Sequence, residues 1–138
     1  MPATNVVETD DLAFRARLGS MQPLDIHHVS VNVADVETAI AFYVGVLGGT
    51  LRGDRPDFGF GGAWIDFGGR QLHLIEAPVP ANLGQHFAVR VADLNATVVE
   101  LRAEGLKISD AVPVGTGLQA FLNDPAGNAI ELHQTNAI

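Results

Sequence analysis

The sequence predicts an α+β fold made of one βαβββ unit that occurs twice in tandem. One observation is an internal repeat: "HVSVNVADVETAI", which begins at His28, resembles "HFAVRVADLNATV", which begins at His86. A second pair of segments, "DFGGRQLHL" from Asp66 and "DPAGNAIEL" from Asp124, is separated by the same 58 positions. One shift that aligns two separated pairs of segments without a gap indicates a duplicated structural unit.

Each unit begins with a strand and a helix. Residues 28–33 and 86–91 alternate between apolar and other side chains, which predicts strands with one buried face. Asp35 and Asp93 follow these strands, and aspartate is preferred at helix N-caps. Apolar residues then recur at helical spacing, up to the glycines that should end each helix: Val36, Ile40, Tyr43 and Leu47 before Gly48, and Leu94, Val98 and Leu101 before Gly105.

Each unit continues with three short strands separated by turn residues. The last two are expected at 63–67 and 71–76 in the first unit, and at 118–122 and 129–134 in the second. "FGGR" and "PAGN" are expected to form the hairpin turns between them. Because a unit of about 50 residues is too small to bury both faces alone, the two units should share one sheet or pair across a dimer.

The length of 138 residues fits a single domain. We expect this domain over residues 23–138, with one module at 26–80 and the other at 83–136. Residues 1–22 are interpreted as an N-terminal extension with a short helix, which Thr9 can cap.

The composition excludes several classes of function. The formal net charge is −8, with eight Lys and Arg and no basic stripe, which argues against a nucleic-acid partner. The absence of cysteine means that any metal site must use histidines and carboxylates. No apolar run approaches the roughly 20 residues of a membrane span, and no secretory signal is visible. We therefore expect a cytoplasmic protein that has no membrane partner.

Strand alternation places four polar residues on faces that point away from the core. The valines of the first strand must face the core, so His28 points to the opposite side, and His86 does so in the second unit. By the same argument, His73 and Glu131 lie on the non-core faces of the last strands. The 58-residue offset relates His28 to His86 and His73 to Glu131.

These four residues form a candidate metal-binding set: His28, His73, His86 and Glu131. Three imidazoles and one carboxylate suit one divalent transition metal, which could be Ni, Zn, Co, Mn or Fe(II). Four ligands leave a coordination position open for a substrate. The alternative is that these side chains line a cup that holds no metal.

Four other residues are candidates for substrate binding. Arg90 and Asn32 occupy equivalent pocket-side positions, and Arg90 could hold a carboxylate or phosphate, or else form an internal ion pair. His133 lies on the same face as Glu131. Trp64 ends the glycine-rich segment 52–64, which is either a lid with an aromatic wall or an ordinary loop.

The segments "HVSVNVADVETAIAFYVGVLG", "HFAVRVAD" and "NDPAGNAIEL" resemble the vicinal oxygen chelate superfamily, which includes glyoxalase I, extradiol dioxygenases and bleomycin-binding proteins. The resemblance covers residues 26–134. It implies that the mixed sheets curve into an open cup, that a dimer mate often completes the cup, and that the metal ligands come from the first and last strands of each module. Those positions in this chain are again His28, His73, His86 and Glu131.

The resemblance implies a divalent-metal-dependent lyase or isomerase that acts on a small oxygen-chelating substrate, with Glu131 as the general base. Glyoxalase I typically has a glutamate or a similar acceptor where this chain has His73, so the chain departs from that enzyme. The alternatives are an Fe(II) extradiol-type dioxygenase and a non-catalytic protein that binds a drug or metabolite. We expect a homodimer, because open sheet edges need cover.

Overall fold

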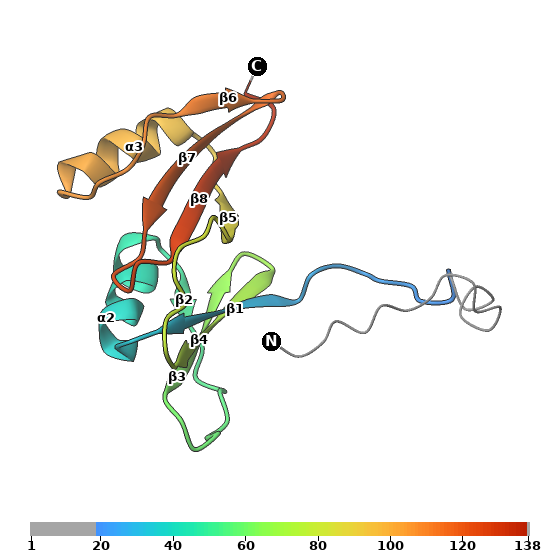
Figure 1. The fold of residues 1–138 in the computed structure, drawn as a ribbon. Coiled ribbons are helices and arrows are strands. Elements are labelled where there is room, and N and C mark those ends of the chain that lie inside the picture. The colour runs from blue at the N-terminus through green and yellow to red at the C-terminus, as the bar shows by residue number, and fades with distance from the viewer. Residues whose placement is uncertain (1–18, 138) are drawn as a thin grey trace.

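A computed structural model describes residues 19–137 of the chain. Its first module contains one helical segment and a four-stranded sheet (Figure 1). The elements are β1 (His28–Val33), α2 (Val36–Ile40), η1 (Ala41–Val46), β2 (Thr50–Leu51), β3 (Gly62–Phe67) and β4 (Arg70–Glu76). The second module repeats the pattern with β5 (His86–Arg90), α3 (Leu94–Ala103), β6 (Val112–Val114), β7 (Gly117–Asn123) and β8 (Ala129–Gln134).

The two sheets have the same topology. Their strand orders are β1-β4-β3-β2 and β5-β8-β7-β6, with the first two strands of each parallel and the others antiparallel. This confirms the predicted α+β fold of two tandem βαβββ modules. β1 and β5 are edge strands, and in the described part of the chain no strand pairs with the outer edge of either.

The residue pairing between strands follows the 58-residue repeat for β1 and β5 but departs from it by one residue in β7. His28 pairs with Gln71 and His86 pairs with Ala129, as the offset of 58 requires. The hairpins differ because two glycines separate Phe67 from its partner Arg70, whereas five residues separate Asn123 from Ala129. The structural counterpart of Trp64, which pairs with His73, is consequently Phe121, which pairs with Glu131.

Both helices begin where the sequence predicts. The Asp35 carboxylate accepts a hydrogen bond from the Thr38 backbone N–H at 3.0 Å, and Asp93 accepts one from Ala96 at 3.0 Å. The first helix differs from expectation, because it changes to a π-helical turn from Ala41. The segment "VGV" at 44–46 combines β-branched residues with glycine, which weakens an α-helix.

The core lies between each sheet and its helix. Among the largest fully buried side chains are Tyr43, Ile65, Leu72 and Leu74 in the first module and Leu94, Ile130 and Leu132 in the second. Both α2 and α3 lie on the same side of the molecule, so the uncovered sheet faces turn away from the helices (Figure 1). These faces are the ones that strand alternation assigns to the candidate site residues.

Polar contacts join the two modules. The Tyr43 hydroxyl donates to the Asp124 carboxylate at 2.7 Å, and the Asn128 side chain donates to the Asn32 backbone carbonyl at 2.8 Å. Burial raises the pKa of the Tyr43 hydroxyl, and the neighbouring Asp124 raises it further. Asp124 is only 4% exposed, so these contacts hold the β7–β8 turn against the first module.

The helix predicted near Thr9 lies outside the described residues. Within residues 19–137, no helix combines the length and apolar character that a membrane crossing would require.

Candidate metal centre

The first pair of candidate ligands lies on the neighbouring strands β1 and β4. The rings of His28 and His73 are stacked, with centroids 3.9 Å apart. His28 shares a hydrogen bond through Nδ1 with Nδ1 of His27 at 2.9 Å, and His73 Nε2 donates to Gln71 Oε1 at 2.9 Å. Burial lowers the pKa of His73, and the charges of nearby histidines and arginines lower it further. His73 is therefore biased toward the neutral imidazole that a metal requires.

The second pair lies on β5 and β8. His86 Nε2 is 3.2 Å from Glu131 Oε1, while His86 Nδ1 donates to the Gly84 carbonyl at 2.9 Å. The other carboxylate oxygen of Glu131 accepts from Nδ1 of His133 at 2.9 Å. His86 Nε2 and Glu131 Oε1 thus face each other, and both are atom types that bind divalent transition metals.

The donor chemistry of these residues fits a divalent metal. In each of the three histidines, one ring nitrogen hydrogen-bonds to a group outside the candidate ligand set, and the second nitrogen of His86 faces the candidate ligand Glu131. Metal-binding histidines are commonly oriented in this way, because the bonded nitrogen fixes the ring and leaves the other nitrogen free to coordinate. Gln71 thus orients His73, His27 orients His28, and His133 orients Glu131. Strand alternation alone did not assign this role to them.

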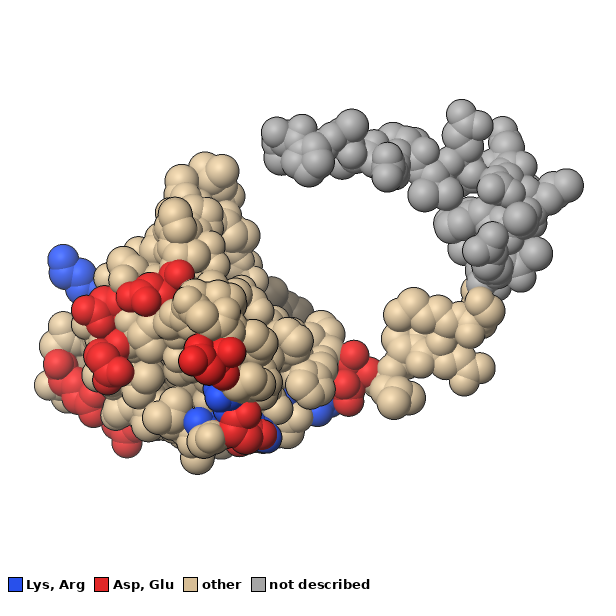
Figure 2. All heavy atoms as spheres, turned by 90° about the horizontal axis from the view of Figure 1, so that it is seen from below, with Lys and Arg blue, Asp and Glu red and all other residues tan. Residues whose placement is uncertain are grey.

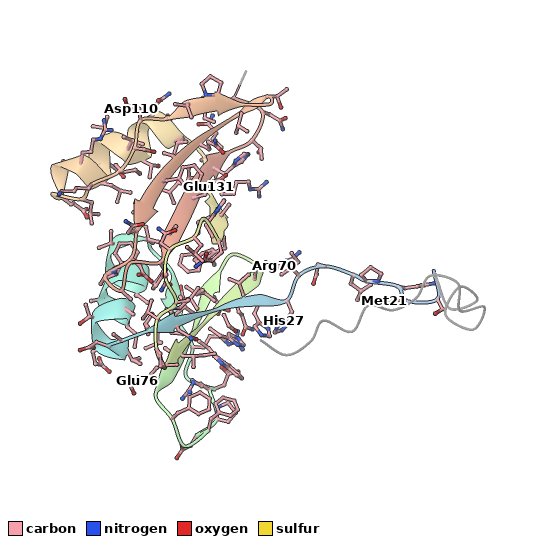
Figure 3. The ribbon with its side chains drawn as sticks, in the orientation of Figure 1. Met21, His27, Arg70, Glu76, Asp110 and Glu131 are labelled. Atoms are coloured by element: carbon pink, nitrogen blue, oxygen red, sulfur yellow. The ribbon has the colours of Figure 1, made fainter. Side chains whose placement is uncertain are left out.

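One chain contains these ligands as two separate pairs. Among the described residues of a single chain, no three His, Asp or Glu side chains gather closely enough to hold one ion. In Figure 3, Glu131 lies on β8 of the second module, whereas His27, which adjoins His28, lies where the chain enters β1 of the first. The four predicted residues share the open side of the fold, but they do not converge within one copy.

A groove of about 1070 Å³ lies between β5 and a wall formed by the start of β1 and the β3–β4 turn. His28, Gln71, His86 and Arg90 are among its lining residues. Arg90 is exposed and forms no ion pair with any described residue, so its guanidinium is free to bind an anion. This geometry favours the substrate-binding role over the internal ion pair.

The side-chain amide of Asn32 forms a hydrogen bond within the chain. It donates to the Pro78 carbonyl at 2.9 Å, and the backbone carbonyl of Asn32 accepts from Asn128. Asn32 therefore ties the start of the inter-module linker to β1, which gives it a structural role that sequence alternation could not distinguish from substrate binding.

An aromatic ring contacts each half of the candidate site. Trp64 on β3 stacks on His73 with centroids 4.6 Å apart, and Phe121 on β7 meets His86 edge-on at 5.2 Å. The sequence singled out Trp64 but missed Phe121, because the ungapped repeat aligns Trp64 with Leu122. The cross-strand register of the second hairpin is the signal that identifies Phe121.

The connection over 52–61 is tied down by ion pairs and hydrogen bonds. Arg52 contacts the carboxylates of Asp54 and Asp66 at 2.8 and 3.0 Å. The Arg52 guanidinium lowers the pKa of Asp54. These contacts favour an ordinary structured loop over a lid.

On the face shown in Figure 2, Asp and Glu side chains cover more of the surface than Lys and Arg side chains do. No basic patch is visible on this face. The distribution agrees with the net charge of −8.

Relatives named as lyases or as an epimerase align with most of this chain. A probable lactoylglutathione lyase from Synechocystis is 29% identical over 80% of this chain and 95% of its own length. The human mitochondrial methylmalonyl-CoA epimerase is 24% identical over 79% of this chain and 73% of its own. A probable chloroplastic lactoylglutathione lyase from Arabidopsis thaliana is 31% identical, but the chain spans only 34% of that longer protein.

Solved structures share the fold. A glyoxalase family protein from Bacillus anthracis superposes with a TM-score of 0.76 at 24% identity, covering 83% of this chain and 98% of that one. An antibiotic binding protein from Streptomyces superposes with a TM-score of 0.72 at 28% identity and the same coverage. The family described as Glyoxalase/Bleomycin resistance protein/Dioxygenase superfamily matches residues 25–132. This chain therefore belongs to the glyoxalase, bleomycin resistance protein and dioxygenase superfamily, also called the vicinal oxygen chelate superfamily.

Proposed function

We propose that the chain is a divalent-metal-dependent lyase or isomerase of the glyoxalase type that acts on a small oxygen-chelating substrate. The observation that carries this proposal is the presence of two ligand pairs at equivalent positions of the repeat, His28 with His73 and His86 with Glu131. Each histidine of these pairs is oriented by a hydrogen bond to its second nitrogen. The names of the relatives, which describe lyases and an epimerase, support the reaction class.

In this proposal the working unit is a homodimer whose metal sites are shared. Each site takes His28 and His73 from one copy and His86 and Glu131 from the other. Two features support this arrangement: the pairs do not converge within one described chain, and β1 and β5 each leave an unpaired edge. Exposed sheet edges are commonly covered by association, and a two-fold dimer would cover both.

The residues of this chain have distinct tasks in the reaction. A divalent ion, when bound, would act as a Lewis acid that polarises the oxygens of the substrate. Glu131 removes a proton next to the substrate carbonyl, and His133 holds its Oε2 at 2.9 Å so that the other oxygen faces the site. Arg90 binds an acidic substituent at the groove. His73 stands where glyoxalase I typically has a glutamate or a similar proton acceptor, so Glu131 is the ligand that carries the proton.

Elemental analysis of untagged protein tests the proposal. We expect about one transition-metal ion per chain in the wild type, and His28→Ala should lower the metal affinity on the order of 100-fold or more. Glu131→Gln should lower the affinity and also abolish turnover, because an amide cannot accept the proton. Wild-type protein that takes up no Ni, Zn, Co, Mn or Fe(II) on dialysis would overturn the proposal. Iron, together with O₂ consumption, would favour a dioxygenase instead.

A binding protein is the second candidate, favoured by the likeness to the Streptomyces antibiotic binding protein at 28% identity. The two functions respond differently to a chelator. If the chain is an enzyme, stripping the metal should abolish turnover of α-hydroxy or α-keto compounds. If it is a binder, calorimetry should give the same ligand affinity before and after treatment with EDTA, and no turnover under either condition.

A further inference from the structure

A continuous series of aromatic rings leads from the candidate ligands to the surface of the first module. His28 stacks on His73 at 3.9 Å, and His73 stacks on Trp64 at 4.6 Å with the planes only 13° apart. Phe58 lies 6.2 Å from Trp64, and Phe60 lies 5.6 Å from Phe58. The three contacts from His73 outward lie within the range of about 4.5–7 Å for favourable ring pairs, and His28 and His73 are stacked more closely still. Ring contacts thus connect the candidate ligands His28 and His73 to Phe58 and Phe60.

The outer end of this series is open to solvent. Phe58 is 49% exposed and Phe60 is 50% exposed. The loop holds both rings in place by its own hydrogen bonds: the Gly59 N–H donates to Asp57 at 2.8 Å, and the Glu76 N–H donates to the Gly61 carbonyl at 2.9 Å. Two adjacent exposed phenyl rings on an ordered loop beside a candidate site form a surface that a flat ligand can cover.

A cation accompanies these rings. The Arg55 guanidinium carbon lies 5.0 Å from the Phe58 centroid and 5.5 Å from the Phe60 centroid. Arg55 donates to the Phe60 carbonyl at 3.0 Å, and it forms no ion pair with any carboxylate in the described range. Arg52, three residues earlier, is held by Asp54 and Asp66. In a chain of net charge −8, Arg55 is thus an available cation with several unused N–H donors.

We propose that the ligand of this protein carries a flat aromatic ring with an anionic group, such as a carboxylate. The ring covers Phe58 and Phe60, and the anion pairs with Arg55. That this ligand also offers chelating oxygens to a metal beside His73 rests on the proposed function, but recognition of the ring and its charge does not. The second module offers no equivalent, because its segment 109–119 contains no aromatic residue.

Binding of three matched probes to metal-stripped protein tests this assignment. Naphthalene-2-carboxylate has both the ring and the charge, cyclohexanecarboxylate has the charge alone, and 2-naphthylmethanol has the ring alone. Calorimetry should give the tightest binding for naphthalene-2-carboxylate. Trp64 is the only tryptophan in the chain, so its indole N–H gives a single NMR signal, which this probe should shift.

Variants separate the contributions of ring and charge. Phe58→Leu should weaken naphthalene-2-carboxylate binding roughly three- to tenfold, whereas Phe58→Tyr, which keeps the ring, should preserve it. Arg55→Gln should reduce the preference for the acid over the alcohol by about fivefold. Lys107→Gln removes an exposed charge from the other module and should change nothing.

Several results would overturn the assignment: no binding of naphthalene-2-carboxylate, equal binding of cyclohexanecarboxylate, an unmoved indole signal, or wild-type affinity in Phe58→Leu. Since the protein is stripped of metal throughout, a failure here leaves the metal content of the wild type untouched. Conversely, ring binding by a protein that takes up no metal would overturn the proposed enzyme and retain this inference.

Discussion

Mixing His28→Ala protein with Glu131→Gln protein is expected to restore high-affinity metal sites that neither variant has alone. If each site combines the first module of one copy with the second module of its partner, a mixed dimer contains one doubly altered site and one intact site. After random exchange of subunits, half of the dimers are mixed, so roughly a quarter of the wild-type sites should return. Titration with Co(II), followed by its visible absorption, counts these sites.

A matched mixture provides the control. The double variant His28→Ala/Glu131→Gln, mixed with an equal amount of wild type, forms mixed dimers in which each site has lost one ligand. A shared site then predicts roughly a quarter of the wild-type capacity, whereas a site within one chain predicts roughly a half. Recovery of no sites in the first mixture and a half in the second would show that the ligands converge within a single copy.

The second large effect concerns stability. Replacement of Asp124 by alanine should lower the free energy of unfolding by about 3 kcal/mol or more. The Asp124 carboxylate accepts hydrogen bonds from the Tyr43 hydroxyl, two backbone N–H groups and the Asn128 amide. Its loss leaves the buried Tyr43 hydroxyl without this acceptor and frees the β7–β8 turn. Urea denaturation, followed by circular dichroism, measures the change.

Tyr43→Phe is the matched control, because it removes one of these bonds and keeps the ring. We expect it to cost about 2 kcal/mol. A loss in Asp124→Ala no larger than that in Tyr43→Phe would contradict the view that the carboxylate organises the turn as well as the module junction.

The same contact predicts a dependence on alkaline pH. The pKa of Tyr43 is raised in the folded state by burial and by Asp124, so the folded protein keeps this proton at pH values where the unfolded chain loses it. The associated stability is complete below the unfolded pKa of about 10 and declines as the pH rises beyond it. Tyr43→Phe should show a smaller decline between pH 9 and 11.

Local sequence patterns were sufficient to predict much of this fold. Strand alternation assigned His28, His86 and Glu131 to the open side, and the two aspartate caps located both helices, because these features depend on neighbouring residues alone. The repeat predicted the topology, since two similar segments adopt the same βαβββ arrangement. The repeat failed at β7, where a turn of five residues makes Phe121, and not Leu122, the partner of Glu131.

The sequence by itself determined that this protein is a duplicated α+β unit with imidazoles and one carboxylate on its uncovered faces. Only the tertiary structure decided that these ligands form two separate pairs, that the Asn32 amide is used inside the chain, and that Arg55 lies over two exposed phenyl rings. The physical reason is that a period of two specifies the face of a strand on which a side chain lies. Distances between strands and modules depend on turn lengths and on contacts such as Tyr43 with Asp124, which no local pattern encodes.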